Sequence, residues 1–136
     1  MVKGISRDLI RNYLDQINIS SRIDDDGDLY TVLSADNDFD HDVIIYYTVS
    51  GNWLRIFGLA ANYTVSDSNK GRVLLALNEF NSSHSTPTGV LEKDRIRFKH
   101  SLLLDEEVSE EYIKENGLKL GTTSIWHAFV DFNKQQ

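Results

Sequence analysis

The chain has no cysteine among its 136 residues. Disulfides, thiolate metal sites and cysteine nucleophiles are therefore excluded, and so is the disulfide framework of many small secreted proteins. The single proline, Pro87, argues against extended linkers. A chain of this length buries roughly two thirds of the surface that its unfolded form exposes. We therefore expect residues 1–136 to fold as a single domain around one core.

The sequence also lacks long apolar runs and any surplus of positive charge. No segment approaches the roughly 20 apolar residues that a bilayer-spanning helix needs, and the N-terminus has no apolar signal-peptide core. The net charge of −7 weakens attraction to nucleic acid and to anionic membranes. We therefore expect a cytoplasmic protein that binds neither nucleic acid nor membrane.

The first half of the chain has the pattern of one helix followed by four strands. Apolar residues at helical spacing predict an amphipathic helix over 5–17, with Ser6 as its N-cap. Two short strands, ending at Ile23 and beginning at Leu29, flank the turn DDDGD. The segments DVIIYYTVS and NWLRIFGLAA form a second hairpin, which turns at Gly51 and Asn52.

The second half predicts a helix, two strands and a last helix. The middle helix has an N-cap among residues 66–68, and its expected core positions are Val73, Leu74, Leu77 and Phe80. The loop SSHSTPTG leads into a strand at GVL, a turn at Lys93 and Asp94, and a strand over 95–104. The expected fold class is α+β, with an antiparallel sheet of about five to six strands in the order α-ββββ-α-ββ-α.

The last helix begins after Ser109, a good N-cap that two glutamates follow. One long helix is the first interpretation. Gly117 and Gly121 each cost about 1 kcal/mol relative to alanine inside a helix, and Asn116 with Gly117 forms a plausible C-cap. A break at these residues therefore stays open as an alternative.

The order of elements, together with four sequence segments, resembles a known family over nearly the whole chain. They are DGDLYTVL, VLLALNEFN, RIRFKHSLLLD and the C-terminal helix, and they resemble the YbjN family of bacterial proteins, described as sensory transduction regulators and similar in fold to type III secretion chaperones. The resemblance implies an antiparallel sheet packed with helices, a tendency to dimerise, and a role in binding or regulating other proteins. Its most specific part contains Leu77, Asn78 and Asn81. We assign the asparagines a structural role, because asparagine near a helix end can satisfy free backbone groups.

Catalytic and metal-binding motifs are not recognisable in the sequence. The four histidines are scattered, and neither H-E-x-x-H nor G-x-S-x-G occurs. Aspartates gather around Gly27, but an EF-hand register would place Arg22 and Leu33 at ligand positions, so a hairpin turn is favoured. We expect no enzyme, no cofactor and no metal. The alternative is a small-ligand or divalent-metal sensor that uses the acidic loop over 36–42 or the SSHSTPTG loop.

The strongest functional indication is apolar surface on both faces of the central strands. Ile44 and Tyr46 alternate with the residues expected in the core. In the next strand, Trp53 and Phe57 lie on the face opposite to that of Leu54 and Ile56. The second face needs a helix of this chain, a second copy or a partner protein to cover it.

Basic residues share a face of one strand in the same region of the sheet, and they could dock an acidic partner. The candidate protein-binding residues are Tyr46, Trp53, Arg55, Phe57, Arg95, Arg97 and Lys99. The sequence thus favours a non-catalytic protein-binding module, chaperone-like or regulatory, that acts as a homodimer.

Overall fold

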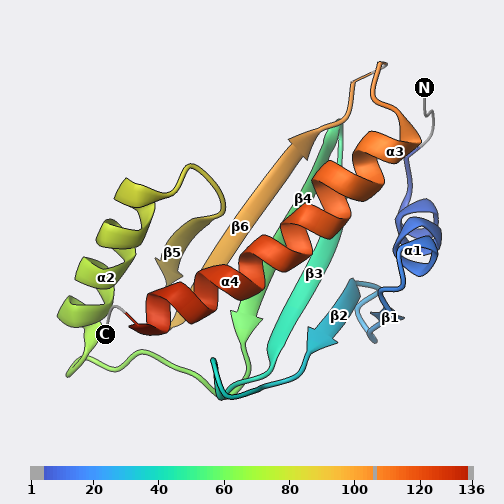
Figure 1. Ribbon diagram of the computed structural model, residues 1–136. Coiled ribbons are helices and arrows are strands. Elements are labelled where there is room, and N and C mark those ends of the chain that lie inside the picture. The colour runs from blue at the N-terminus through green and yellow to red at the C-terminus, as the bar shows by residue number, and fades with distance from the viewer. Residues whose placement is uncertain (1–4, 106, 135–136) are drawn as a thin grey trace.

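The computed structural model describes residues 5–105 and 107–134 as an α+β domain (Figure 1). Its elements are α1 (Arg7–Gln16), β1 (Arg22–Ile23), β2 (Leu29–Leu33), β3 (Val43–Ser50), β4 (Trp53–Ala60), α2 (Lys70–Ser83), β5 (Thr88–Glu92), β6 (Arg95–Leu103), α3 (Glu110–Tyr112), η1 (Ile113–Lys119) and α4 (Leu120–Lys134). The segment η1 is a π-helical stretch. This order confirms the predicted α+β fold with an antiparallel sheet.

The six strands form one antiparallel sheet in the order β1-β2-β3-β4-β6-β5. Both turns predicted from glycine are present. Gly27 has a φ of +85° and Gly51 a φ of +58°, which are left-handed conformations that glycine adopts without steric cost. Local turn signals therefore join β1 to β2 and β3 to β4, whereas the loop over 34–42 joins β2 to β3, and the β4–β6 pairing joins strands separated by α2 and β5.

The helices cover one face of the sheet. Figure 1 shows α4 crossing that face diagonally, with α1 and α2 on either side. The core between the layers includes Ile10, Leu14, Ile45, Leu54, Ile56, Phe80, Phe98, Ile125 and Phe129, each at most 1% exposed. Full burial of such a side chain stabilises the fold by about 1.5–3 kcal/mol. This contact fixes which side of every strand faces inward.

The last helical segment runs without a break from α3 through η1 to α4. Ser109 caps it, because its hydroxyl accepts a hydrogen bond from the Tyr112 N–H at 3.1 Å. The glycines allow the helix to approach the sheet closely. A Cβ on Gly121 would lie 2.8 Å from Ile56 Cδ1, and one on Gly117 would lie 3.0 Å from Leu102 Cδ2. The alternative of a break at these glycines is therefore wrong.

The structure corrects the expected start and core face of the middle helix. The helix begins at Lys70 with Asn69 as its N-cap, and no serine among residues 66–68 holds that position. The Asn69 Oδ1 instead accepts a hydrogen bond from the Ser66 N–H at 2.9 Å, which closes the preceding turn. Leu74 is 46% exposed and faces away from the core. Its spacing fits a helix, but the core stripe passes through Val73, Ala76 and Phe80.

The end of α2 is joined to β5 through Asn81. The Asn81 Nδ2 donates to the Gly89 carbonyl at 2.9 Å, and the Asn81 Oδ1 accepts from the Gly89 N–H at 2.9 Å. A Cβ on Gly89 would lie 2.8 Å from Leu77 Cδ2, so Leu77 also packs directly against this residue. Both asparagines are exposed, but within the described residues the Asn78 side chain makes no hydrogen bond, and only its backbone carbonyl accepts one, from the Ser82 hydroxyl.

A buried hydrogen bond links the sheet to α4. The Tyr47 and Thr122 hydroxyls lie 2.6 Å apart, and these residues are 3% and 4% exposed. Burial raises the pKa of Tyr47 far above its ordinary value, so the phenol stays protonated. Each hydroxyl depends on the other, because an unpaired polar group costs free energy in an apolar core.

Replacing Thr122 by valine keeps the side-chain shape but removes the partner of the Tyr47 hydroxyl. We expect Thr122→Val to lower the free energy of unfolding by about 1–3 kcal/mol, measured by urea denaturation. The double variant Tyr47→Phe, Thr122→Val removes both polar groups and should recover much of this loss. A double variant less stable than the single variant would contradict the assignment.

The pair Asn81→Ala and Asn78→Ala compares an asparagine whose side chain bonds to β5 with one whose side chain makes no hydrogen bond within the described residues. We expect Asn81→Ala to lower the free energy of unfolding by about 1–3 kcal/mol, because the Gly89 N–H and carbonyl lose their partner. The control Asn78→Ala should change it by no more than about 0.5 kcal/mol. Equal losses in the two variants, again by urea denaturation, would contradict a special role for Asn81.

Candidate protein-binding face

The sheet has a second face, opposite the helices, which we call the open face. It presents side chains that alternate with the core residues along each strand. Its aromatic and aliphatic residues are Tyr30, Val32, Ile44, Tyr46, Trp53, Phe57, Leu59, Val90 and Leu103, and its charged residues are Arg22, Arg55, Glu92, Arg95, Arg97 and Lys99. Val32, Trp53 and Leu103 are 46%, 39% and 48% exposed. Within the described residues, no helix lies over this face.

A row of aromatic rings crosses the middle of the open face. Strand register places Tyr30 beside Tyr46 and Tyr46 beside Phe57. The Tyr46 and Phe57 rings stack with centroids 5.2 Å apart, and Tyr30 leans on Tyr46 at 5.9 Å. The Arg97 guanidinium lies 5.0 Å from the centre of the Phe57 ring. The faces of these rings are therefore occupied by contacts with one another and with a cation.

The open face is basic although the chain as a whole is acidic. Its strand residues include five basic side chains and one acidic side chain, Glu92, while at the β1 end burial and then the charges of Asp24 and Asp28 in the neighbouring turn raise the pKa of Tyr46. Lys99 donates a hydrogen bond to Glu92, and Arg97 Nε lies 3.3 Å from Glu92 Oε2 without hydrogen-bond geometry. The Lys99 hydrogen bond, followed by the charges of Lys99 and Arg97, lowers the pKa of Glu92. Glu92 is therefore ionised at neutral pH and only partly neutralises its two neighbours.

Arg55 is an open-face cation that is free to contact a partner. It is exposed, and its guanidinium makes no hydrogen bond or ion pair within the described part of the chain, where only its backbone carbonyl accepts a hydrogen bond, from the Thr48 hydroxyl. It lines a hollow of ≈ 240 Å³ with Thr48, Phe57, Arg97, Lys99 and Ser101. Basic groups and hydroxyls side by side favour an anionic group such as a carboxylate.

The structure brings most of the predicted binding residues together on the open face. Tyr46, Arg55, Phe57, Arg97 and Lys99 lie in adjacent strands, and Trp53 lies at the end of β4. Arg95 is at the opposite end, where its Nη2 donates to the Ala60 carbonyl at 2.8 Å. It therefore serves partly to hold β6 against the end of β4.

Sequence reasoning missed Tyr30, Val32 and Leu59 on this face. Each alternates with a core residue in its own strand, so the alternation alone could have assigned them to it. It also missed Phe39, which is 2% exposed and packs 5.4 Å from the Phe129 ring. A single aromatic residue among aspartates was the available signal that the acidic loop is anchored under α4.

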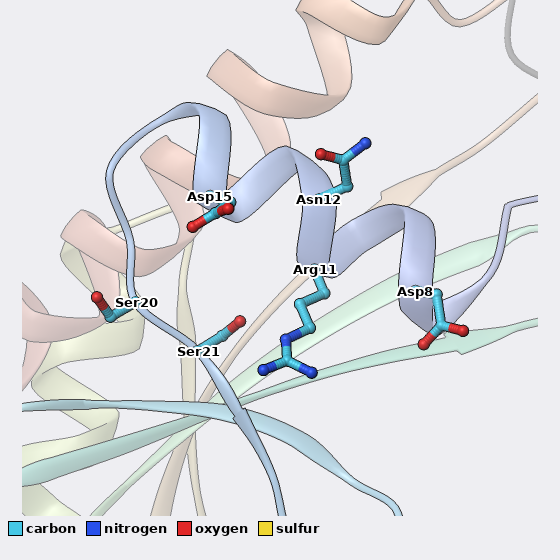
Figure 2. Close-up of a pocket in the computed structure, with 6 residues that line it drawn as sticks. All are labelled: Asp8, Arg11, Asn12, Asp15, Ser20 and Ser21. Atoms are coloured by element: carbon cyan, nitrogen blue, oxygen red, sulfur yellow. The ribbon is translucent and has the colours of Figure 1, made fainter.

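A hollow beside α1 offers little to a small ligand. Its volume is ≈ 450 Å³, and its lining consists of Asp8, Arg11, Asn12, Asp15, Ser20 and Ser21. Figure 2 shows these side chains pointing in different directions, with Asn12 directed away from Arg11, and Asp8 and Asp15 at opposite ends of the helix. Small-ligand sites are mostly apolar with a few convergent polar groups, and this lining has neither property.

The clustered aspartates mainly close turns. Within residues 5–105 and 107–134, only Asp24, Asp26 and Asp28 place three possible metal-ligating groups within 4.8 Å of one another. The Asp24 Oδ1 already accepts the N–H groups of Asp26 and Asp28, at 3.0 and 2.9 Å. In the second cluster, Asp36 Oδ1 accepts the Asp38 N–H at 2.8 Å. These contacts favour the turn interpretation over a metal-binding one.

His84 and His100 lie in separate structural contacts. His100 is buried, with its Nδ1 2.9 Å from the Thr86 hydroxyl. His84 Nε2 lies 3.7 Å from Asp131 Oδ2, but its ring stacks on Phe80 and its Nδ1 lies 2.9 Å from the Phe80 carbonyl. This His–Asp pair joins α2 to α4 and does not form a nucleophile–base arrangement. Within the described ranges, no helix is both long and apolar enough to cross a bilayer.

The comparisons with known proteins agree with this architecture. The solved structure titled "Crystal structure of YbjN, a putative transcription regulator from E. coli" matches with a TM-score of 0.75 and 18% sequence identity, over 97% of this chain and 94% of that chain. This similarity establishes the fold. A comparison with curated proteins gave no match.

A family model identifies the relationship through the sequence itself. It is the model of the YbjN family, described as "Putative bacterial sensory transduction regulator", and it matches residues 6–116. The match runs from the first helix into η1 and includes the whole sheet and the segment LNEFN. The resemblance seen in the sequence is therefore confirmed, and this chain belongs to the YbjN family.

Proposed function

We propose that this protein is a non-catalytic protein-binding module, with a chaperone-like or regulatory role, that acts in the cytoplasm as a homodimer. The observation that supports it best is the open face, a row of aromatic and aliphatic side chains flanked by cations and free of any helix within the described residues. Apolar patches of this kind with polar rims are typical of interaction sites. The family description as a regulator agrees with such a role.

The alternative of a small-ligand or metal sensor has weaker support. The hollow beside α1 is lined by diverging polar groups, and in the two acidic clusters Asp24 and Asp36 already accept backbone N–H groups. The open face, in contrast, combines aromatic anchors with arginine, which are the residues enriched where proteins bind one another. We therefore assign the main function to the open face.

The homodimer is best supported by the outer side of α2. Leu75 is 63% exposed and Leu74 46% exposed there. Arg72 and Glu79 lie three residues before and four residues after Leu75, so they share its flank of the helix. A two-fold axis near Leu75 places Arg72 of one copy beside Glu79 of the other, in an antiparallel pair of α2 helices. The outer side of α2 thus offers exposed leucines between charges of opposite sign that can pair across such an axis.

Charge reversal at Arg55 tests the binding function. We expect Arg55→Glu to lose proteins that the tagged wild-type protein retrieves from a lysate of the cells that encode it, quantified by mass spectrometry. The control is Arg11→Glu, which reverses an exposed arginine on α1 and should retrieve the wild-type set. Identical retrieval by all three proteins would reject the open face as the binding surface.

The dimer surface is tested by placing a charge at Leu75. At concentrations on the order of tens of micromolar, we expect light scattering to give a dimer mass for the wild type and a monomer mass for Leu75→Glu, because burying an unpaired carboxylate opposes association. Leu103→Glu alters an exposed leucine on the open face and should stay dimeric. A monomeric wild type would overturn the dimer. Dissociation by Leu103→Glu, but not by Leu75→Glu, would place the dimer interface on the open face.

A further inference from the structure

The open face has features that define the chemistry of its partner. We propose that it binds an acidic amphipathic helix of another protein, with the apolar side of that helix on the aromatic row and its carboxylates at the basic ends of the row. This inference rests on the proposed function and adds to it the class of partner.

Charge complementarity supports an acidic partner. The strand register forms a continuous row of Arg22, Tyr30, Tyr46, Phe57 and Lys99 across five strands. Arg22 and Lys99 therefore stand at the two ends of an aromatic centre, and the Lys99 end, with Arg97 and Arg55, is the more basic one because Asp24 and Asp28 lie near the Arg22 end. Each end also adjoins a hollow, one of ≈ 350 Å³ that Arg22 and Tyr30 line, and the one of ≈ 240 Å³ that Arg55 and Lys99 line. Two anionic side chains separated by an apolar stretch fit this layout.

The backbone of the sheet supports a helix. Strands β3, β4 and β6 are each paired on both sides, so their backbone N–H and carbonyl groups are already bonded within the sheet. A polypeptide lying on the open face finds side chains there and no free backbone groups. Its own buried backbone must therefore be hydrogen-bonded internally, which a helix achieves. The α4 helix covers the other face of the same strands in this way.

The row also sets the length of that helix. Arg22 in β1 and Lys99 in β6 are separated by four strand-to-strand steps, or about 19 Å at about 4.8 Å per step. A helix rises about 1.5 Å per residue, so roughly 13 residues span the row. Apolar residues at i, i+3, i+4 and i+7 would face the rings, and acidic residues beside them would reach the cations.

Two other occupants fit the open face less well. A second copy packed face to face about a two-fold axis near Arg55, Arg97 and Lys99 would bring these cations against their own equivalents, and such like-charge contacts are unfavourable. Single-stranded nucleic acid needs free ring faces for its bases to stack on. Here the Tyr46 and Phe57 rings stack on each other, and Arg97 lies over Phe57.

The probe is a synthetic peptide of about 18 residues with leucines at i, i+3, i+4 and i+7 and glutamates on its flanks. We expect it to bind the full-length protein, measured by fluorescence anisotropy, with a dissociation constant in the micromolar range. Arg55→Glu should weaken binding about tenfold, and Arg11→Glu should leave it unchanged. A central proline should weaken it on the order of 100-fold, because proline breaks the helix.

Several results would overturn the proposal. They are the absence of binding by the acidic peptide, equal binding of a scrambled peptide of the same composition, equal weakening by Arg11→Glu, and tighter binding of single-stranded DNA. If Arg55→Glu loses proteins in the lysate experiment but the peptide does not bind, the helical acidic partner is rejected and the protein-binding function is kept. Failure of both experiments would reject the function as well.

Discussion

The close packing of the C-terminal helix on one face of the sheet is the contact on which the rest of the structure depends. Gly117 and Gly121 bring this helix against side chains such as Ile56. Since side chains alternate along a strand, this contact decides the side of the sheet on which each residue lies. It places Tyr47 in the core and Tyr46 on the open face, although the two are neighbours in sequence.

Local signals explain why most of the fold could be predicted. The turns at Gly27 and Gly51 need a backbone conformation that glycine favours, and the caps at Ser6 and Ser109 use a hydroxyl three residues before the N–H group it accepts from. These interactions lie within a few residues of the chain. The sequence left open whether the last helix breaks at Gly117 and Gly121, because helix propensity does not account for a sheet that packs closely against the helix.

Long-range register limited what could be predicted of the site. The alternation in β4 and in β6 can each be found in the sequence, but residues 61–94 separate these strands. The pairing of Phe57 with Lys99, and the position of Arg97 over the Phe57 ring, depend on how this connection returns to the sheet. The types of residue on the open face were therefore predictable, whereas their arrangement into a row with basic ends was not.

The arrangement of the open face explains how it can stay exposed and still be ready for a partner. The side chain of Arg97 covers part of the aromatic row, and long basic side chains shield apolar surface while their charges stay in water. The chain has 21 acidic and 14 basic residues, so most of its surface repels another acidic protein. Salt screens such repulsion beyond about 8–10 Å, whereas the cations of the open face act at contact. In the proposed binding mode, an acidic partner would therefore be held away from the rest of the surface and accepted where the cations gather.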